Sequence, residues 1–150
     1  MIDSATLLKE EVLSGLRKNP KSLPSKYFYD DEGSRIFQEI MDMPEYYLPE
    51  AESEIIENRS EEIAKRINVA KLDIIELGAG DGRKVVHFID VLSREILDVS
   101  YFPLDISESI LEVNGQLIRS EVPMVTYRSL AGDYFNTLPK LRENSNPRLI

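Results

Sequence analysis

The feature that most constrains the fold is a glycine-rich turn placed directly after a short apolar run. Residues 72–77 are mostly apolar, and Gly78, Gly80 and Gly82 follow them at alternate positions. The whole chain of 150 residues holds only 7 glycines. Glycine adopts left-handed backbone conformations at little steric cost and lets other groups approach the main chain closely. The pattern therefore predicts a buried strand, a tight loop and then a helix.

The residues after this loop alternate between helical and strand patterns. We expect helices over 83–97 and 107–119, the second capped by Ser107, and strands over 99–105, 125–130 and from 148 onward. Pro103 weakens the case for the second strand, because proline cannot donate a ladder hydrogen bond. The alternation predicts βαβ units, a parallel sheet and right-handed crossovers. A doubly wound sheet has about six strands, so 71–150 is expected to be a half that stops at its fourth strand.

The first 70 residues carry helical patterns and no strand pattern. Apolar spacing predicts helices over 4–18, 34–42 and 50–67. Two aromatic, proline-bounded loops separate them, at 19–33 and 44–50. The first loop ends in Asp-Asp-Glu-Gly, which is typical of a turn. We expect a helical segment over 1–70 that precedes the sheet.

Composition excludes several classes of function. The net charge of −9 argues against nucleic acid and anionic membranes as main partners. The chain has no cysteine, which removes disulfides, thiolate nucleophiles and cysteine-based zinc sites. The single histidine, His87, is expected to be a partly buried structural residue, and no metal site is predicted. No stretch resembles a membrane span or a signal peptide, so a cytoplasmic location is expected.

The position of the glycine loop predicts a ligand site. Ligands of open parallel sheets bind beyond the carboxyl ends of the strands, where this loop lies. The following helix offers free N–H groups to a carboxylate or phosphate. A dinucleotide site expects Gly-x-Gly-x-x-Gly, whereas this loop reads Gly-x-Gly-x-Gly after Glu76, the form usual in S-adenosylmethionine-dependent methyltransferases. A tight turn without any ligand is the alternative.

Polar residues at the next two strand ends suit an adenosine. Asp105 follows the second strand and can accept hydrogen bonds from both ribose hydroxyls, or it can cap a helix. Asp133, followed by Tyr134, can accept from an adenine amino group, or it can belong to an ordinary turn. Lys84 stands near the positive end of a helix dipole, where it can meet the methionine carboxylate of the cofactor or simply be solvated.

Four stretches carry a family resemblance: 23–34, 44–52, 76–84 and 103–107. Together they resemble the histidine-specific N-alpha-methyltransferases, over nearly the whole chain from about residue 16 to residue 150. The resemblance implies an α/β, Rossmann-like class I methyltransferase fold with a partial parallel sheet, preceded by the N-terminal helical segment. It implies S-adenosyl-L-methionine as cofactor and a small amino acid, histidine, as the acceptor of methyl groups on its α-amino group.

The resemblance also assigns residues to the site. Gly78, Lys84, Asp105, Asp133 and Tyr134 match family positions that contact the cofactor, and Gly80 belongs to the same loop. Tyr46 matches a tyrosine that contacts the substrate, and Tyr29 matches an aromatic residue lining the pocket. The aromatic loops of 1–70 would then form part of a lid over the amino acid. The alternative is that these tyrosines are core residues anchored by prolines.

Family members continue well beyond residue 150, and their later substrate-binding residues have no counterpart here. No residue is assigned as the catalytic base. A non-catalytic fragment that binds S-adenosylmethionine or a nucleotide is therefore kept as an alternative function. A nicotinamide-dependent oxidoreductase is a third possibility that the glycine spacing disfavours. The number of methyl groups transferred and the oligomeric state are not predicted.

Overall fold

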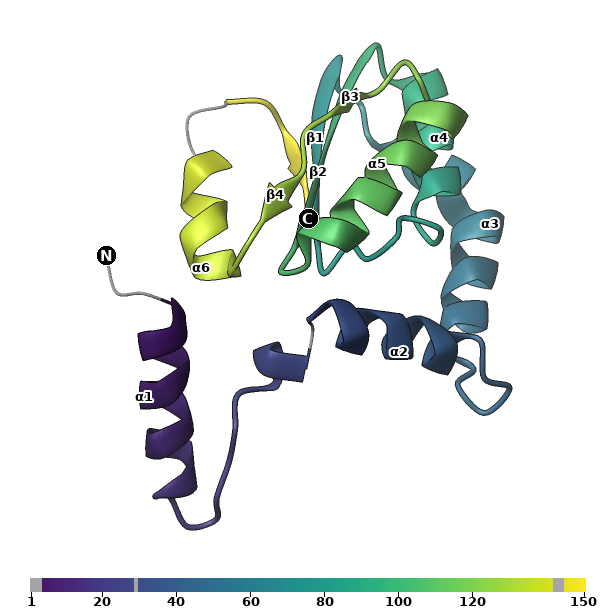
Figure 1. Ribbon diagram of the computed structural model, residues 1–150. Coiled ribbons are helices and arrows are strands. Elements are labelled where there is room, and N and C mark those ends of the chain that lie inside the picture. Colours follow the sequence, from purple (N-terminus) through teal and green to yellow (C-terminus); the bar gives the residue numbers. More distant parts are fainter. Residues whose placement is uncertain (1–3, 29, 142–144) are drawn as a thin grey trace.

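A parallel sheet forms the centre of the protein, as the computed structural model of residues 4–28, 30–141 and 145–150 shows (Figure 1). The strands are β1 (Lys71–Leu77), β2 (Asp98–Asp105), β3 (Thr126–Tyr127), β4 (Leu130–Ala131) and β5 (Arg148–Leu149). Their order is β3-β2-β1-β5, with β4 also paired to β2, and every pairing is parallel. This confirms the α/β class predicted from the alternating pattern.

The strand order places a switch in direction at β1. From β1 the chain moves to β2 and β3 on one side, and then returns to pair β5 with the other side of β1. The register opposes Asp73 to Arg148 and Ile74 to Leu149, so the predicted fourth strand has begun. Ligands of doubly wound sheets bind at such a switch point. The glycine loop therefore starts from the strand with the most favourable position for a ligand.

The predicted third strand is divided into two short pieces, β3 and β4. Tyr127 lies opposite Tyr101 and Leu130 lies opposite Leu104, so the break falls beside Pro103. The carbonyl of Tyr101 accepts a hydrogen bond from the N–H of Arg128, which follows β3. The carbonyl of Leu104 accepts from residues of the loop after β1 instead. The backbone groups of successive residues in a strand point to alternate sides, so those of Pro103 point to the same side as those of Tyr101, toward the break. Because proline has no N–H to donate, the ladder is interrupted there.

Helices α4 (Val86–Glu95) and α5 (Glu108–Glu121) cover the sheet, and α6 (Tyr134–Thr137) follows β4. The cap of α5 is as predicted, since Ser107 accepts from the N–H of Ile110 at 3.3 Å. α4 starts three residues later than expected, because the N–H groups of Val85 and Val86 both bond to the carbonyl of Gly82 in a turn.

The prediction for His87 is wrong, because its side chain is exposed. The apolar stripe of α4 includes Ile89 and Leu92, both fully buried, and it continues from Val85. His87 is two residues from Val85 and from Ile89, which is about 200° around a helix of 3.6 residues per turn. The histidine therefore lies on the opposite side of the helix from the core.

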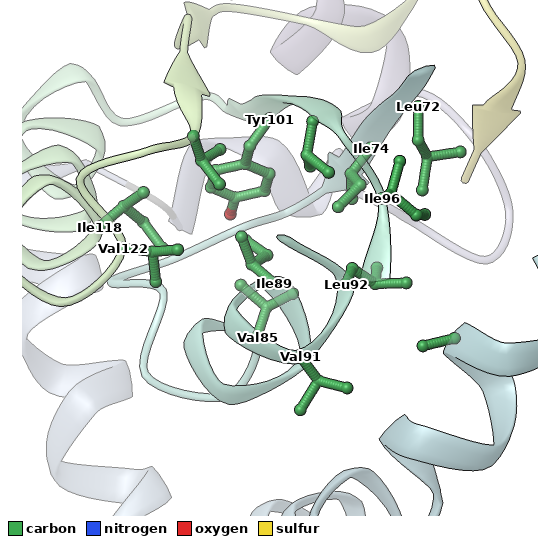
Figure 2. Close-up of a cluster of buried hydrophobic side chains, with 13 residues drawn as sticks. Leu72, Ile74, Val85, Ile89, Val91, Leu92, Ile96, Tyr101, Ile118 and Val122 are labelled. Carbon is green, nitrogen blue, oxygen red and sulfur yellow. The ribbon is translucent and has the colours of Figure 1, made fainter. Parts of the chain in front are cut away.

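The core occupies both faces of the sheet. The larger cluster joins Leu72, Ile74 and Tyr101 to apolar residues of α4 and α5, and Figure 2 shows these side chains meeting beneath the strands. A smaller cluster joins Ile75, Phe102 and Leu104, whose side chains alternate to the other face. This explains the nearly continuous apolar run of β1, which is typical of a strand buried on both sides.

The N-terminal segment contains α1 (Ser4–Leu16), the 3₁₀ turn η1 (Ser25–Phe28), α2 (Asp31–Met41) and α3 (Leu48–Arg66). The Asp-Asp-Glu-Gly stretch is not the turn that we expected. The side chain of Asp30 accepts from the N–H of Gly33 at 2.8 Å, so it caps α2 and residues 31–33 form its first turn. Figure 1 shows α3 beside α4 and α1 standing away from the sheet. None of the helices in the described ranges is long and apolar enough to cross a membrane.

Candidate cofactor-binding site

The glycine loop adopts the left-handed conformation at all three glycines. The φ angles of Gly78, Gly80 and Gly82 are 69°, 54° and 83°. A side chain is strained at such angles. At Gly80 a Cβ atom would meet no atom within 4 Å, so the space in front of the loop is open. The glycines are therefore needed for the backbone path, and the loop leaves room for a ligand.

The loop is fastened to the end of β2 by backbone donors. The N–H groups of Gly78 and Ala79 donate to the carbonyl of Leu104 at 2.8 and 3.1 Å. The N–H of Gly80 donates to the carboxylate of Asp105 at 3.1 Å. Three hydrogen bonds thus join the loop after β1 to the end of β2.

A cavity of about 500 Å³ opens at this edge, within the usual range of about 300 to 1,000 Å³ for ligand pockets. All six residues predicted to contact a cofactor line it, and the structure brings them together from three strand ends. Among the described residues, the lining is Ser25, Lys26, Phe37, Gln38, Met41, Gly78, Ala79, Gly80, Asp81, Lys84, Asp105, Ile106, Ile110, Gly132, Asp133 and Tyr134. Contact of the six with a cofactor stays a prediction.

Asp105 links the loop to the turn before α5. One carboxylate oxygen accepts from Gly80 N–H and the other accepts from Ser107 N–H at 3.0 Å. Ser107, not Asp105, is the residue that caps α5. Each carboxylate oxygen has a further lone pair, so Asp105 can still accept from two hydroxyl groups.

Asp133 and Tyr134 close the far side of the cavity. Asp133 caps α6, because its side chain accepts from the N–H of Phe135 at 2.8 Å. The N–H of Gly132 donates to the carbonyl of Asp105 at 2.8 Å, which joins the end of β4 to that of β2. A Cβ atom on Gly78 would lie 3.0 Å from the Tyr134 hydroxyl, so this tyrosine reaches across to the loop. Asp133 therefore belongs to a helix start rather than to an ordinary turn.

The two cations after the loop reach the N-terminal helices. Lys84 Nζ lies 2.8 Å from a carboxylate oxygen of Glu52 on α3. Arg83 pairs with Asp81 and also donates to the side-chain oxygen of Gln38 on α2 at 2.6 Å. Lys84 is thus not simply solvated, and it also lines the cavity. Its contact with the methionine carboxylate stays a prediction.

The two predicted substrate tyrosines have different outcomes. Tyr46 is not among the residues that line the cavity. Its ring instead packs edge-on against Phe37, with centroids 6.4 Å apart, and Phe37 does line the cavity. Tyr29 lies outside the described residues. The structure therefore places Tyr46 behind the wall of the pocket, one side chain away from it.

Sequence reasoning missed a buried polar group beneath the loop. The hydroxyl of Tyr101 donates to the carboxylate of Glu76. Burial raises the pKa of Glu76 to about 7, although the Tyr101 hydrogen bond and the charge of Lys84 oppose this increase. Burial and the charge of Glu76 likewise raise the pKa of Tyr101. The available signal was an acid near the end of a mostly apolar strand.

α2 supplies three lining residues that the sequence analysis also missed: Phe37, Gln38 and Met41. Phe37 and Met41 are four residues apart and so share one face of the helix. That spacing was visible in the sequence, but nothing in it indicated that this face meets the glycine loop. Across the described residues, no cluster of three potential metal ligands is found.

Comparison with known proteins identifies the family. Residues 8–150 match the sequence model of a family described as "Histidine-specific methyltransferase, SAM-dependent". The chain is 37% identical over 134 residues to histidine N-alpha-methyltransferase of Mycobacterium tuberculosis, covering 89% of this chain and 41% of that protein. It is 34% identical over 137 residues to 4-dimethylallyltryptophan N-methyltransferase of Claviceps fusiformis, covering 91% and 38%.

Solved structures give a weaker likeness. One is the plantazolicin methyltransferase BpumL in complex with SAH, at 16% identity and a TM-score of 0.48, covering 88% of this chain and 44% of that one. The chain spans about two fifths of the length of the two curated relatives. The family assignment itself rests on the match over residues 8–150. The chain therefore belongs to the histidine-specific, S-adenosylmethionine-dependent methyltransferase family.

Proposed function

We propose that the cavity binds S-adenosylmethionine and that the chain takes part in transferring its methyl group to the α-amino group of an amino acid, with histidine as the first candidate. One observation carries this proposal: Gly80, Asp105 and Asp133, from three successive strand ends, line a single cavity. The family description supports the choice of cofactor. The relatives named as histidine N-alpha-methyltransferases support the choice of acceptor.

The proposed roles follow from the chemistry of each group. Asp105, held by two backbone N–H groups, would accept from the ribose hydroxyls. Asp133 would accept from the adenine amino group, and Tyr134 would pack beside it. The open space at Gly80 would allow close approach of the amino acid part of the cofactor, and Lys84 would bind its carboxylate.

The cofactor, when bound, supplies a methyl group that is already activated by a positively charged sulfur. The protein then needs to hold a neutral amine in line with the sulfur–methyl bond and to keep water away. We propose that residues 1–70 serve as the lid for this purpose and that 71–150 is the cofactor-binding half. The N-terminal side already contributes Lys26 and Phe37 to the cavity wall, which supports the division.

The names of two relatives give their acceptors as histidine and 4-dimethylallyltryptophan, and both are amino acids with a planar ring. We include both classes of acceptor in the proposal for this chain.

A second candidate function is a fragment that binds S-adenosylmethionine or a nucleotide without catalytic activity. The chain spans about two fifths of the length of these relatives. A cytoplasmic location completes the proposal, in keeping with a chain that has no cysteine for disulfides.

Calorimetric titration with S-adenosylmethionine, its demethylated product and NAD⁺ tests the cofactor assignment. We expect the first two to bind and NAD⁺ not to bind. Binding of NAD⁺ alone, or of none of the three, would refute the proposal. Mass spectrometry of reactions with histidine, tryptophan and 4-dimethylallyltryptophan then separates an enzyme from a binding fragment, because only an enzyme yields methylated product.

A further inference from the structure

Asn114 is a polar residue in an apolar position. It lies on α5 between Leu111 and Ile118, at the helical spacing of the buried stripe, and its side chain is 0% exposed. Burying an amide is unfavourable unless hydrogen bonds compensate for the lost water. A position that faces the core and still carries an amide therefore calls for a specific partner.

The partner is the glycine loop. The amide nitrogen of Asn114 donates to the carbonyl of Gly80 at 3.1 Å and to the hydroxyl of Tyr101 at 3.3 Å. These two bonds use both protons of the side-chain NH₂ group. The same amide lies directly under Gly82, where a Cβ atom would come within 2.9 Å of its nitrogen. Asn114 thus contacts two of the three glycines of the loop.

The hydrogen bonds around Asn114 run in one direction. Asn114 donates to Tyr101, and Tyr101 in turn donates to the carboxylate of Glu76 at the end of β1. The acceptor at the end of this chain fixes the direction of the Tyr101 hydroxyl. The oxygen of that hydroxyl can then accept a hydrogen bond from Asn114. The amide nitrogen of Asn114, rather than its oxygen, is therefore the atom that faces Tyr101 and Gly80.

The amide oxygen of Asn114 is buried and has no hydrogen-bond partner within the described part of the chain. An unpaired buried acceptor lowers stability, so an apolar residue of the same shape would suit the core better. The amide of Asn114 thus stabilises the conformation of the loop, while its unpaired oxygen makes the packing of α5 less favourable.

We propose that Asn114 is a positioning residue, which holds the Gly80 carbonyl down and thereby keeps the loop open toward the cavity. The inference rests on the proposed function for the identity of the ligand. The position of Asn114 behind the loop means that it acts through Gly80 and Gly82 without touching the cofactor.

The main test replaces Asn114 by leucine, which has a similar shape and no donor. Gln116→Leu is the matched control, because Gln116 is an exposed amide on the same helix. Glycines are labelled with ¹³C at the carbonyl. A carbonyl carbon that loses a hydrogen bond shifts upfield, so we expect the Gly80 signal to move in Asn114→Leu while that of Gly33 on α2 stays in place.

Binding of S-adenosylhomocysteine by calorimetry is the second readout. We expect Asn114→Leu to weaken it by about tenfold or more, the size expected for one lost buried hydrogen bond, with little change in urea stability. Gln116→Leu should bind as the wild type does. If the wild type binds no ligand, the proposed function fails, and the carbonyl shift still decides the role of Asn114.

Asn114→Ala, with Gln116→Ala as its control, covers the case in which the leucine variant does not fold. An unchanged Gly80 signal in a folded variant would overturn the inference. Failure of both variants to fold would also overturn it, since Asn114 would then be a general packing residue.

Discussion

The two halves of the chain bury their side chains to different extents. In the sheet half, Glu76, Tyr101 and Asn114 are connected beneath the glycine loop, and Tyr101 belongs to the larger apolar cluster on that face of the sheet. In the N-terminal segment, α1 leaves four leucines more than 40% exposed: Leu7, Leu8, Leu13 and Leu16. The strand-end side of the cavity is therefore backed by buried side chains, whereas much of the apolar surface of α1 stays exposed.

Two of the contacts that join the halves are polar and lie near the surface. Lys84 meets Glu52 and Arg83 meets Gln38, and these pairs are formed by side chains near the surface. Exposed ion pairs are worth about 0 to 1 kcal/mol. Breaking these two contacts would therefore cost little, but α3 is also held by Ala64, which is 1% exposed and belongs to the larger core cluster.

The largest contrast is expected from truncating one leucine in each half. Leu92 of α4 is fully buried, so Leu92→Ala should lower the free energy of unfolding by about 2 to 5 kcal/mol. Leu8→Ala, at a side chain that is 41% exposed, should change it by much less. Urea unfolding followed by circular dichroism measures both. Equal losses would show that α1 is as firmly packed as the sheet.

The pH dependence of stability tests the partly buried Glu76. The pKa of Glu76 is raised to about 7 from 4.5, so the folded state holds this proton where the unfolded state has released it. The contribution of Glu76 to stability is therefore greatest below pH 4.5 and falls as the pH rises to about 7, by up to about 3 kcal/mol.

Glu76→Gln removes this loss, because a neutral amide still accepts from Tyr101. We expect the variant to be more stable than the wild type at pH 8 and similar at pH 4.5, in urea unfolding at both values. The exposed Glu57→Gln serves as control. A variant that is less stable at pH 8 would mean that the charge of Glu76 is favourable where it lies.

Replacement of Gly80 and of Gly82 by alanine is expected to lower the thermal stability by different amounts. Both have positive φ, which costs about 1 to 2 kcal/mol for a residue with a side chain. Gly80→Ala meets open space, whereas Gly82→Ala meets the amide of Asn114 at 2.9 Å. Thermal unfolding should therefore show a lower midpoint for Gly82→Ala than for Gly80→Ala. The reverse order would place the crowded side of the loop at Gly80.

The smallest effect is expected at the contact of α1 with η1. Glu11 accepts from Lys26 Nζ at 2.9 Å and from the Tyr27 hydroxyl at 2.7 Å, and the first of these is the main reason that the pKa of Glu11 is lowered. Glu11→Gln should leave the unfolding midpoint nearly unchanged. Hydrogen exchange of residues 4–16 should become faster, while exchange of β1 should not. Unchanged exchange in α1 would show that another contact holds this helix.

Much of the sheet half could be predicted because its patterns are local. The apolar run of β1, the cap at Ser107 and the glycine spacing each identify an element without knowledge of its neighbours. The convergence of Gly80, Asp105 and Asp133 followed from parallel strands, whose carboxyl ends share one edge. Family resemblance was not needed for that step, although it was needed for histidine as a substrate.

What could not be predicted depends on contacts between distant residues. The split of the third strand is caused by Pro103 in the neighbouring strand, not by anything within 125–130. The position of Tyr46 behind Phe37 depends on how a loop folds onto α2. Asn114 reads as one more polar residue in a helix until the loop above it is known.

The division of the outer strand into β3 and β4 has a consequence for behaviour in concentrated solution. Each piece is two residues long, so that border of the sheet has no long row of free N–H and C=O groups. A foreign strand finds little there to pair with, and short border strands are one way in which natural proteins avoid aggregation. Pro103, which interrupts the ladder, thus also lowers the tendency of the protein to self-associate along this border of the sheet.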